Sequence, residues 1–129
     1  MKAEEFYARV HELGGLESRK EGKRWSIATL GALWHLLPNA ETRRHFASQL
    51  PRALKSALLD EPPRALLMDR DAFVQHVGAA LGVHAPDGAR ALRIVYQVLR
   101  EALSPGQIDE LEAHVPKDVA ALLRREPAA

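Results

Sequence analysis

The sequence predicts an all-α protein, a helical bundle of about eight segments built from two pseudo-symmetric repeats around two long central helices. Three observations lead to this prediction. The apolar content of 47% comes mainly from Leu and Ala, which favour helices over strands. Apolar residues recur every three or four positions along most of the chain. The second half repeats the apolar spacing of the first at an offset of about 66 residues.

Composition limits the classes of function. At 129 residues the chain can bury one core, so we expect a single domain. The net charge of +1 gives no general attraction to nucleic acid or to anionic membranes. The absence of cysteine excludes disulfides and thiolate sites and fits a reducing cytoplasm. No signal peptide or apolar membrane span is recognisable, so we expect a cytoplasmic protein without a membrane partner.

The first repeat is predicted over residues 3–59. Its first helix presents one apolar face and should end at Gly14–Gly15, because glycine favours a helix stop. Ser18 and Glu21 have the spacing of a capping box, which predicts the start of a long helix. This helix should end just before Pro38, whose nitrogen cannot donate a hydrogen bond.

The remaining boundaries follow from caps and prolines. Asn39 is expected to cap a third helix, and Pro51 to stand in the first turn of a fourth. Repeat one is then followed by a linker at 60–68, repeat two at 69–124 and a tail at 125–129 that we expect to fray.

Matched positions in the two halves indicate the duplication. Phe73 repeats the place of Phe6, and Ser104 takes the place of Asn39 as a predicted cap. Further matched pairs are Val77 with Val10, Gly88 with Gly22, Leu99 with Leu33, and Leu103 with Leu37. Because units of this size cannot each bury a core, the repeats should pack on one another near a pseudo-two-fold axis.

Several of these features resemble a known family. The F-x-x-x-V pattern at 6–10 and at 73–77, Gln49-Leu50-Pro51 and Val115-Pro116 are similar to the bacterial family catalogued as domain of unknown function 2267. The resemblance spans both halves and implies an all-helical two-repeat fold in a bacterial cytosolic protein. It implies no activity and no site residue, because the family has no established function.

No catalytic or metal signature stands out. The six histidines lie in six segments without ligand spacing: His11, His35, His45, His76, His84 and His114. The acidic segment 109–112 is expected near the first turn of a helix, where the dipole explains it. We therefore expect a protein that is not an enzyme and has no metal or cofactor. A cleft that joined two of His35, His45 and Glu41 would favour catalysis instead.

One face of the first long helix differs from its counterpart. In the second long helix, polar residues form one stripe: Arg90, Arg93, Gln97, Arg100 and Glu101. The matched positions in the first long helix include Ile27, Gly31, Trp34 and His35. Since an Ile beside a Trp is unusual on the surface of a monomer, we expect this face to be covered.

Three kinds of cover remain open. The face could be covered from within, by Leu66, Leu67 and Met68 of the linker or by the other repeat. A protein partner could bind there, and a second copy of the chain would make a contact about a two-fold axis. A small apolar ligand could fill the notch at Gly31. The resulting hypothesis is a non-catalytic interaction or assembly module, expected as a homodimer, with the candidate interface Ile27, Gly31, Trp34 and His35.

The polar stripe supports an alternative function. Arg90, Arg93, Gln97 and Arg100 share one predicted helical face and could contact the phosphates of a nucleic acid. A solvated surface is the simpler explanation, because the net charge is near zero and no aromatic residue interleaves the stripe. Nucleic acid is therefore the less favoured partner.

Overall fold

The computed structural model describes residues 1–60 and 68–124, and these residues form eight helices without any β-strand, as predicted. The helices are α1 (Ala3–Gly14), α2 (Arg19–Leu36), α3 (Ala40–Ser48), α4 (Arg52–Leu59), α5 (Arg70–Leu81), α6 (Ala85–Ala102), α7 (Pro105–Ala113) and α8 (Lys117–Leu123). The predicted tail and most of the predicted linker lie outside the described residues. None of these eight helices combines the length and the hydropathy that crossing a bilayer requires.

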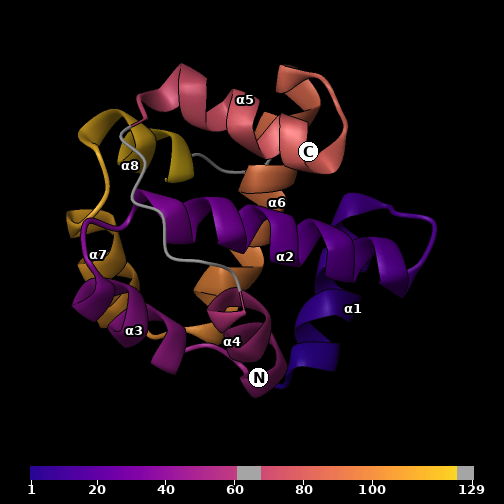
Figure 1. Cartoon of the computed structure of the whole chain (residues 1–129). Helices are drawn as coiled ribbons and strands as arrows, with labels where there is room; N and C mark the ends of the chain where they lie inside the picture. Colours follow the sequence, from indigo (N-terminus) through magenta and orange to yellow (C-terminus); the bar gives the residue numbers. More distant parts are fainter. Residues whose placement is uncertain (61–67, 125–129) are drawn as a thin grey trace.

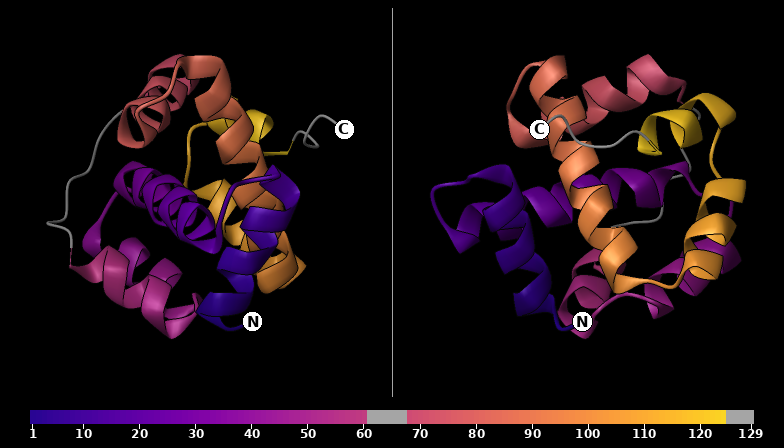
Figure 2. Two further views of the ribbon diagram at one scale, coloured as in Figure 1. Left: turned by 90° about the vertical axis from the view of Figure 1, so that its right-hand side faces the viewer. Right: turned by 180° about the vertical axis from the view of Figure 1, so that it is seen from behind.

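The two long helices, α2 and α6, cross in the middle of the molecule, and the shorter helices surround them (Figures 1 and 2). α1 packs against both long helices, and so does α5. α4 packs on α2 and α8 packs on α6. At the end of α2 that leads into α3, α3 and α7 lie close to each other (Figure 1). Elements from opposite halves of the sequence therefore meet at this end of the bundle.

The helices of the two halves correspond in order and in length. The lengths are 12 and 12 residues for α1 and α5, 18 and 18 for α2 and α6, 9 and 9 for α3 and α7, and 8 and 7 for α4 and α8. The contacts of α1 with α2 and α6 have counterparts in those of α5 with α6 and α2. The predicted duplication requires such a pattern, and the duplication itself stays a prediction.

The helices begin and end at capping residues and glycines of the sequence. Gly15 and Gly82 end α1 and α5 in the left-handed conformation, with φ of 59° and 70°. Three predicted caps accept a hydrogen bond from the backbone N–H of the third helical residue: Ser18, Asn39 and Ser104. At the first of these caps, the carboxylate of Glu21 binds Arg24 instead of completing the capping box.

Two matched glycines allow neighbouring helices to approach closely. A Cβ on Gly22 of α2 would collide with the carbonyl oxygen of Tyr7 in α1. A Cβ on Gly88 of α6 would lie 2.9 Å from the Cα of Gly78 in α5. Since backbone atoms cannot give way as a flexible side chain can, both contacts require glycine.

Candidate functional site

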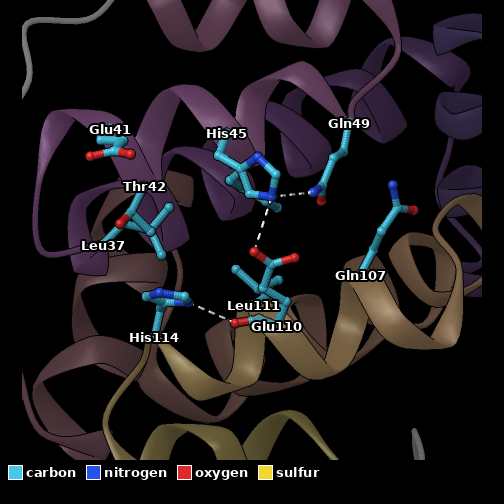
Figure 3. Close-up of a pocket in the computed structure, with 10 residues that line it drawn as sticks. Leu37, Glu41, Thr42, His45, Gln49, Gln107, Glu110, Leu111 and His114 are labelled. Atoms are coloured by element: carbon cyan, nitrogen blue, oxygen red, sulfur yellow. Dashed lines mark hydrogen bonds and ion pairs between the residues drawn. The ribbon is translucent and has the colours of Figure 1, made fainter.

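A pocket of about 400 Å³ lies between α3 and α7 (Figure 3). Its apolar lining consists of Leu37, Phe46 and Leu111. Its polar lining consists of Glu41, Thr42, His45, Gln49, Gln107, Glu110 and His114. The volume falls within the range of sites for small molecules, which typically join an apolar surface to a few convergent polar groups.

Helical spacing explains why these side chains face one another. The lining residues Thr42 and His45 of α3 and Gln49, which directly follows it, recur at intervals of three and four. Gln107 and Glu110 of α7 and His114, which directly follows it, recur in the same way. Asn39 and Ser104 fix where the two helices begin, and each caps its helix by a side-chain hydrogen bond. The pocket is therefore formed by one face of each of two short, well-capped helices (Figure 3).

His45 and Glu110 meet across the pocket. The Nε2 atom of His45 lies 3.0 Å from Oε1 of Glu110 and 3.2 Å from Nε2 of Gln49 (Figure 3). One imidazole nitrogen cannot donate to the carboxylate and accept from the amide at the same time. When Nε2 carries its proton, the hydrogen bond is to Glu110, and Nδ1 of the neutral ring keeps a lone pair. Both side chains are about half exposed, so solvent screens this pair.

The second histidine of the pocket is held by the backbone. Nδ1 of His114 lies 2.8 Å from the carbonyl oxygen of Glu110. Because a carbonyl oxygen only accepts, Nδ1 carries the proton of this hydrogen bond. The Nε2 atom of the neutral His114 ring is then a hydrogen-bond acceptor.

Other polar groups of the pocket are less committed. Oε1 of Gln107 accepts a hydrogen bond of 2.9 Å from the backbone of Ser104, which leaves its amide NH₂ group uncommitted. The side chains of Glu41 and Thr42 make no hydrogen bond or ion pair with the part of the chain that the structure describes. These groups are available to a bound molecule.

The pocket is lined by two of the three residues whose convergence would favour catalysis. Glu41 and His45 line the same cleft, which is the convergence that would favour catalysis, whereas His35 lies elsewhere. His35 on α2 is next to His76 on α5, with ring centroids 5.8 Å apart. Within residues 1–60 and 68–124, no cluster of three or more His, Asp or Glu residues could hold a metal ion.

The structure buries the centre of the interface predicted on α2. Trp34 is only 4% exposed in the single chain, while Ile27, Gly31 and His35 are partly buried. Trp34 is therefore covered within the chain, and it offers little surface to a partner. Of the residues predicted to cover this face, Met68 is partly buried against the core, whereas Leu66 and Leu67 lie outside the described residues.

The arginine residues of the polar stripe on α6 contact different parts of the molecule. Arg90 donates a hydrogen bond of 2.9 Å to the carbonyl oxygen of Gly14, and Arg100 donates one of 2.9 Å to that of Leu123. These two guanidinium groups thus bind the carboxyl ends of α1 and α8, where carbonyl oxygens lack helical partners. Arg93 instead lines a second, more open pocket between α5 and α6.

The prediction for the acidic segment 109–112 was wrong. α7 begins at Pro105, so its first turn contains no acidic residue and the helix dipole does not explain the segment. Glu110 lines the pocket, and Glu112 is 8% exposed and belongs to a buried network. A helix that begins after the predicted cap, Ser104, reaches residue 109 only after its first turn, so the dipole explanation did not follow from the predicted start.

The buried network joins α6, α7 and the end of α8. Tyr96 donates a hydrogen bond of 2.7 Å to Oε2 of Glu112, and Nε of Arg124 donates one of 2.7 Å to Oε1. Burial, followed by the hydrogen bond to Glu112, raises the pKa of Tyr96 well above its usual value. No local sequence pattern predicts this network, because its members are 16 and 12 residues apart along the chain.

Comparison with known proteins shows to which family the chain belongs. A search of curated proteins finds no match. The model of the family described as "Uncharacterized conserved protein (DUF2267)" matches residues 3–122, which include nearly all of the eight helices. The chain therefore belongs to the DUF2267 family, as its spacing of apolar residues and prolines suggested.

Proposed function

We propose that this chain is a non-catalytic interaction module of the cytoplasm and that its binding site is the pocket between α3 and α7. The observation that carries the proposal is the convergence of polar side chains from both halves of the sequence around an apolar lining. Several of these groups make no side-chain hydrogen bond or ion pair with residues 1–60 and 68–124, as is usual for residues that contact a ligand.

A binding role fits this pocket better than catalysis. Thr42 supplies the hydroxyl in the described lining, and it makes no hydrogen bond to an imidazole that would activate it as a nucleophile. His45 directs Nε2 at the carboxylate of Glu110, and His114 directs Nδ1 at a backbone carbonyl. The polar groups are therefore arranged to orient a bound molecule.

Two other surfaces support binding less well. Self-association through the face of Ile27 and Gly31 has to proceed without Trp34 as an exposed anchor, because that side chain is buried. In a contact with nucleic acid, Arg90 and Arg100 would be restricted by their hydrogen bonds to helix carbonyls. Both remain proposals, and neither is built around a formed cavity.

The test blocks the pocket and leaves the rest of the helix unchanged. We expect small organic compounds that bind the protein to shift the backbone amide resonances of α3 and α7 in NMR spectra. Thr42→Trp should abolish these shifts, and Gln49→Trp serves as a second blocking variant. Arg44→Trp, an exposed position on α3 outside the pocket, is the matched control and should bind like the wild type.

Three results would contradict the proposal. Shifts that persist in both blocked variants would place binding elsewhere. Turnover of a bound compound that depends on His45 would favour an enzyme. Salt-sensitive binding of DNA or RNA that is lost in Arg93→Gln would favour the polar stripe instead. Thermal unfolding of each variant shows whether the fold is retained.

A further inference from the structure

We infer that the pocket between α3 and α7 accepts an organic cation, an ammonium or guanidinium group carried on an alkyl stem. This inference rests on the proposed function and names the chemistry of the bound group. The shared chemistry has two sources, a free amine or the side chain of a Lys or Arg residue in a partner. The hydrogen-bond inventory and the charge of the lining residues lead to it.

Acceptors dominate the uncommitted groups of the pocket. Glu41 makes no hydrogen bond or ion pair among the described residues, and Oε2 of Glu110 likewise has no partner there. In their neutral forms, His45 keeps a lone pair on Nδ1 and His114 keeps one on Nε2. Fewer groups are uncommitted donors: the hydroxyl of Thr42, the NH₂ group of Gln107 and, in this tautomer of His45, the NH₂ group of Gln49. A group that fits this lining donates several hydrogen bonds.

The charge of the lining residues also favours a bound cation. Glu41 and Glu110 supply two carboxylates, and the lining residues that the structure describes include no Lys or Arg. A bound carboxylate or phosphate would face these charges without a cationic partner. An ammonium or guanidinium group instead forms charge-assisted hydrogen bonds with them.

The apolar lining explains why the cation should carry a stem. Leu37, Phe46 and Leu111 provide carbon surface beside the polar groups. A small inorganic cation would leave this surface in contact with water. An alkyl chain of the length found in Lys or Arg covers it while the charged end stays near the carboxylates.

The two histidines make the site sensitive to pH. The titratable groups that face the pocket are Glu41 and His45 from α3, and Glu110 and His114 from α7. The residue contributed from the end of α2 is Leu37, which carries no charge. Protonation of either imidazole adds a positive charge and removes an acceptor, so binding of a cation should weaken in acid.

The experiment compares four probes with the same stem. Butylammonium, butylguanidinium, butanol and butyrate are titrated into the isotope-labelled protein, and the shifts of α3 and α7 amides are measured. The two cations should bind at millimolar concentrations and more tightly at pH about 8 than at pH about 5.5, while butyrate should not bind. N-acetyl-lysine methylamide represents the side chain of a partner. Binding of this probe as well as butylammonium identifies the shared chemistry, and binding of one of them alone identifies the source.

Charge-removing variants test the assignment of the site. Glu110→Gln keeps the shape of the side chain and a hydrogen bond to His45, and it should weaken butylammonium binding about fivefold. Glu41→Gln should have a similar or smaller effect. Asp109→Asn is the matched control, because Asp109 is exposed on the same helix and does not line the pocket.

The outcomes separate the two proposals. Butanol or butyrate binding in the pocket as tightly as the cations would overturn the inference and leave the binding function intact. Equal effects of Asp109→Asn and Glu110→Gln would overturn it as well, because the attraction would then be general. An absence of shifts in α3 and α7 with these probes and with every compound of the wider screen would overturn both.

Discussion

The matched faces of the two long helices, α2 and α6, are covered by different kinds of contact. On α6, the guanidinium group of Arg100 lies 5.0 Å from the ring centre of Tyr96 and donates to the carbonyl of Leu123. At the matched position of α2, Trp34 is buried, and its indole N–H has no hydrogen-bond partner within the described residues. One helix thus covers this face with directional polar contacts, and the other covers it by burying an aromatic ring.

The difference extends to the neighbouring helices. The second half holds the network of Tyr96, Glu112 and Arg124. The predicted offset matches these three positions to Leu30, Ala47 and Leu59 in the first half. A set of hydrogen bonds in one half therefore stands where the other half has only apolar side chains. A fully paired polar network and a set of apolar residues both avoid unsatisfied buried groups. Apolar residues can therefore take the place of this network if all of its members are replaced together.

Other contacts are shared by the two halves. Arg24 of α2 donates a hydrogen bond of 3.0 Å to the carbonyl of Leu81 at the end of α5. Arg90 of α6 donates one of 2.9 Å to the carbonyl of Gly14 at the end of α1. Each long helix thus binds the carboxyl end of a short helix from the other half. This role explains basic residues near the start of α2, where its own dipole disfavours them.

The largest effect should come from a shared feature, the close contacts at Gly22 and Gly88. Gly88→Ala should lower the free energy of unfolding by about 3 kcal/mol, because the new methyl group meets the backbone of α5. Gly22→Ala should have an effect of similar size, because its methyl group meets the backbone of α1. Urea unfolding followed by circular dichroism measures both changes.

The control for these variants is Gly106→Ala. Gly106 lies in the first turn of α7, and no described atom comes within 4 Å of the added Cβ. A midpoint of Gly88→Ala equal to that of Gly106→Ala would show that the helices separate easily. The contrast between contacts shared by the two halves and contacts found in only one half would then fail.

A smaller effect is expected from the network that only the second half contains. Tyr96→Phe should lower the free energy of unfolding by about 2 kcal/mol, because the buried carboxylate of Glu112 loses a hydrogen bond. Tyr7→Phe is the matched control, since its hydroxyl makes no hydrogen bond within the described residues. Equal losses in the two variants would mean that the hydrogen bond from Tyr96 to Glu112 contributes nothing beyond the loss of a tyrosine hydroxyl.

The same network predicts how stability changes in alkali. The pKa of Tyr96 is raised above its usual value of 10.0, chiefly by burial and then by Glu112. The folded state therefore keeps the phenol proton where the unfolded state loses it. The resulting stabilisation is complete below pH about 10 and is lost as the pH rises above it. In Tyr96→Phe, most of this loss between pH about 8 and about 11 should disappear, and Tyr7, whose pKa is raised by burial and then by Glu4, should account for a remainder.

The helices and their ends were predictable because local residues determine them. Gly15, Ser18, Asn39 and Ser104 act within a few residues of the chain, and each has the predicted role at a helix end. The start of α7 after Ser104 agrees with its predicted cap, and Pro105 suits the first helical turn, whereas the acidic segment 109–112 lies beyond that turn.

The pocket could not be predicted in the same way. His45 and Glu110 are 65 residues apart in the sequence, and each lies among ordinary polar residues of a short helix. Their approach depends on how α2 and α6 cross, which apolar periodicity does not specify. For Trp34, the sequence identified a side chain that must be covered, and the chain itself supplies the cover.

The smallest effect, with the opposite sign, is expected at Gly31, in the middle of the α2 face that differs from α6. No described atom lies within 4 Å of a Cβ placed there. Gly31→Ala should therefore raise the free energy of unfolding by up to about 1 kcal/mol, through the better helix propensity of alanine. Urea unfolding at two protein concentrations measures it. A loss of stability that is the same at both concentrations would indicate close packing within the chain. A loss that grows with concentration would show that the notch is a contact between copies, and that the two long helices differ because one of them binds a partner.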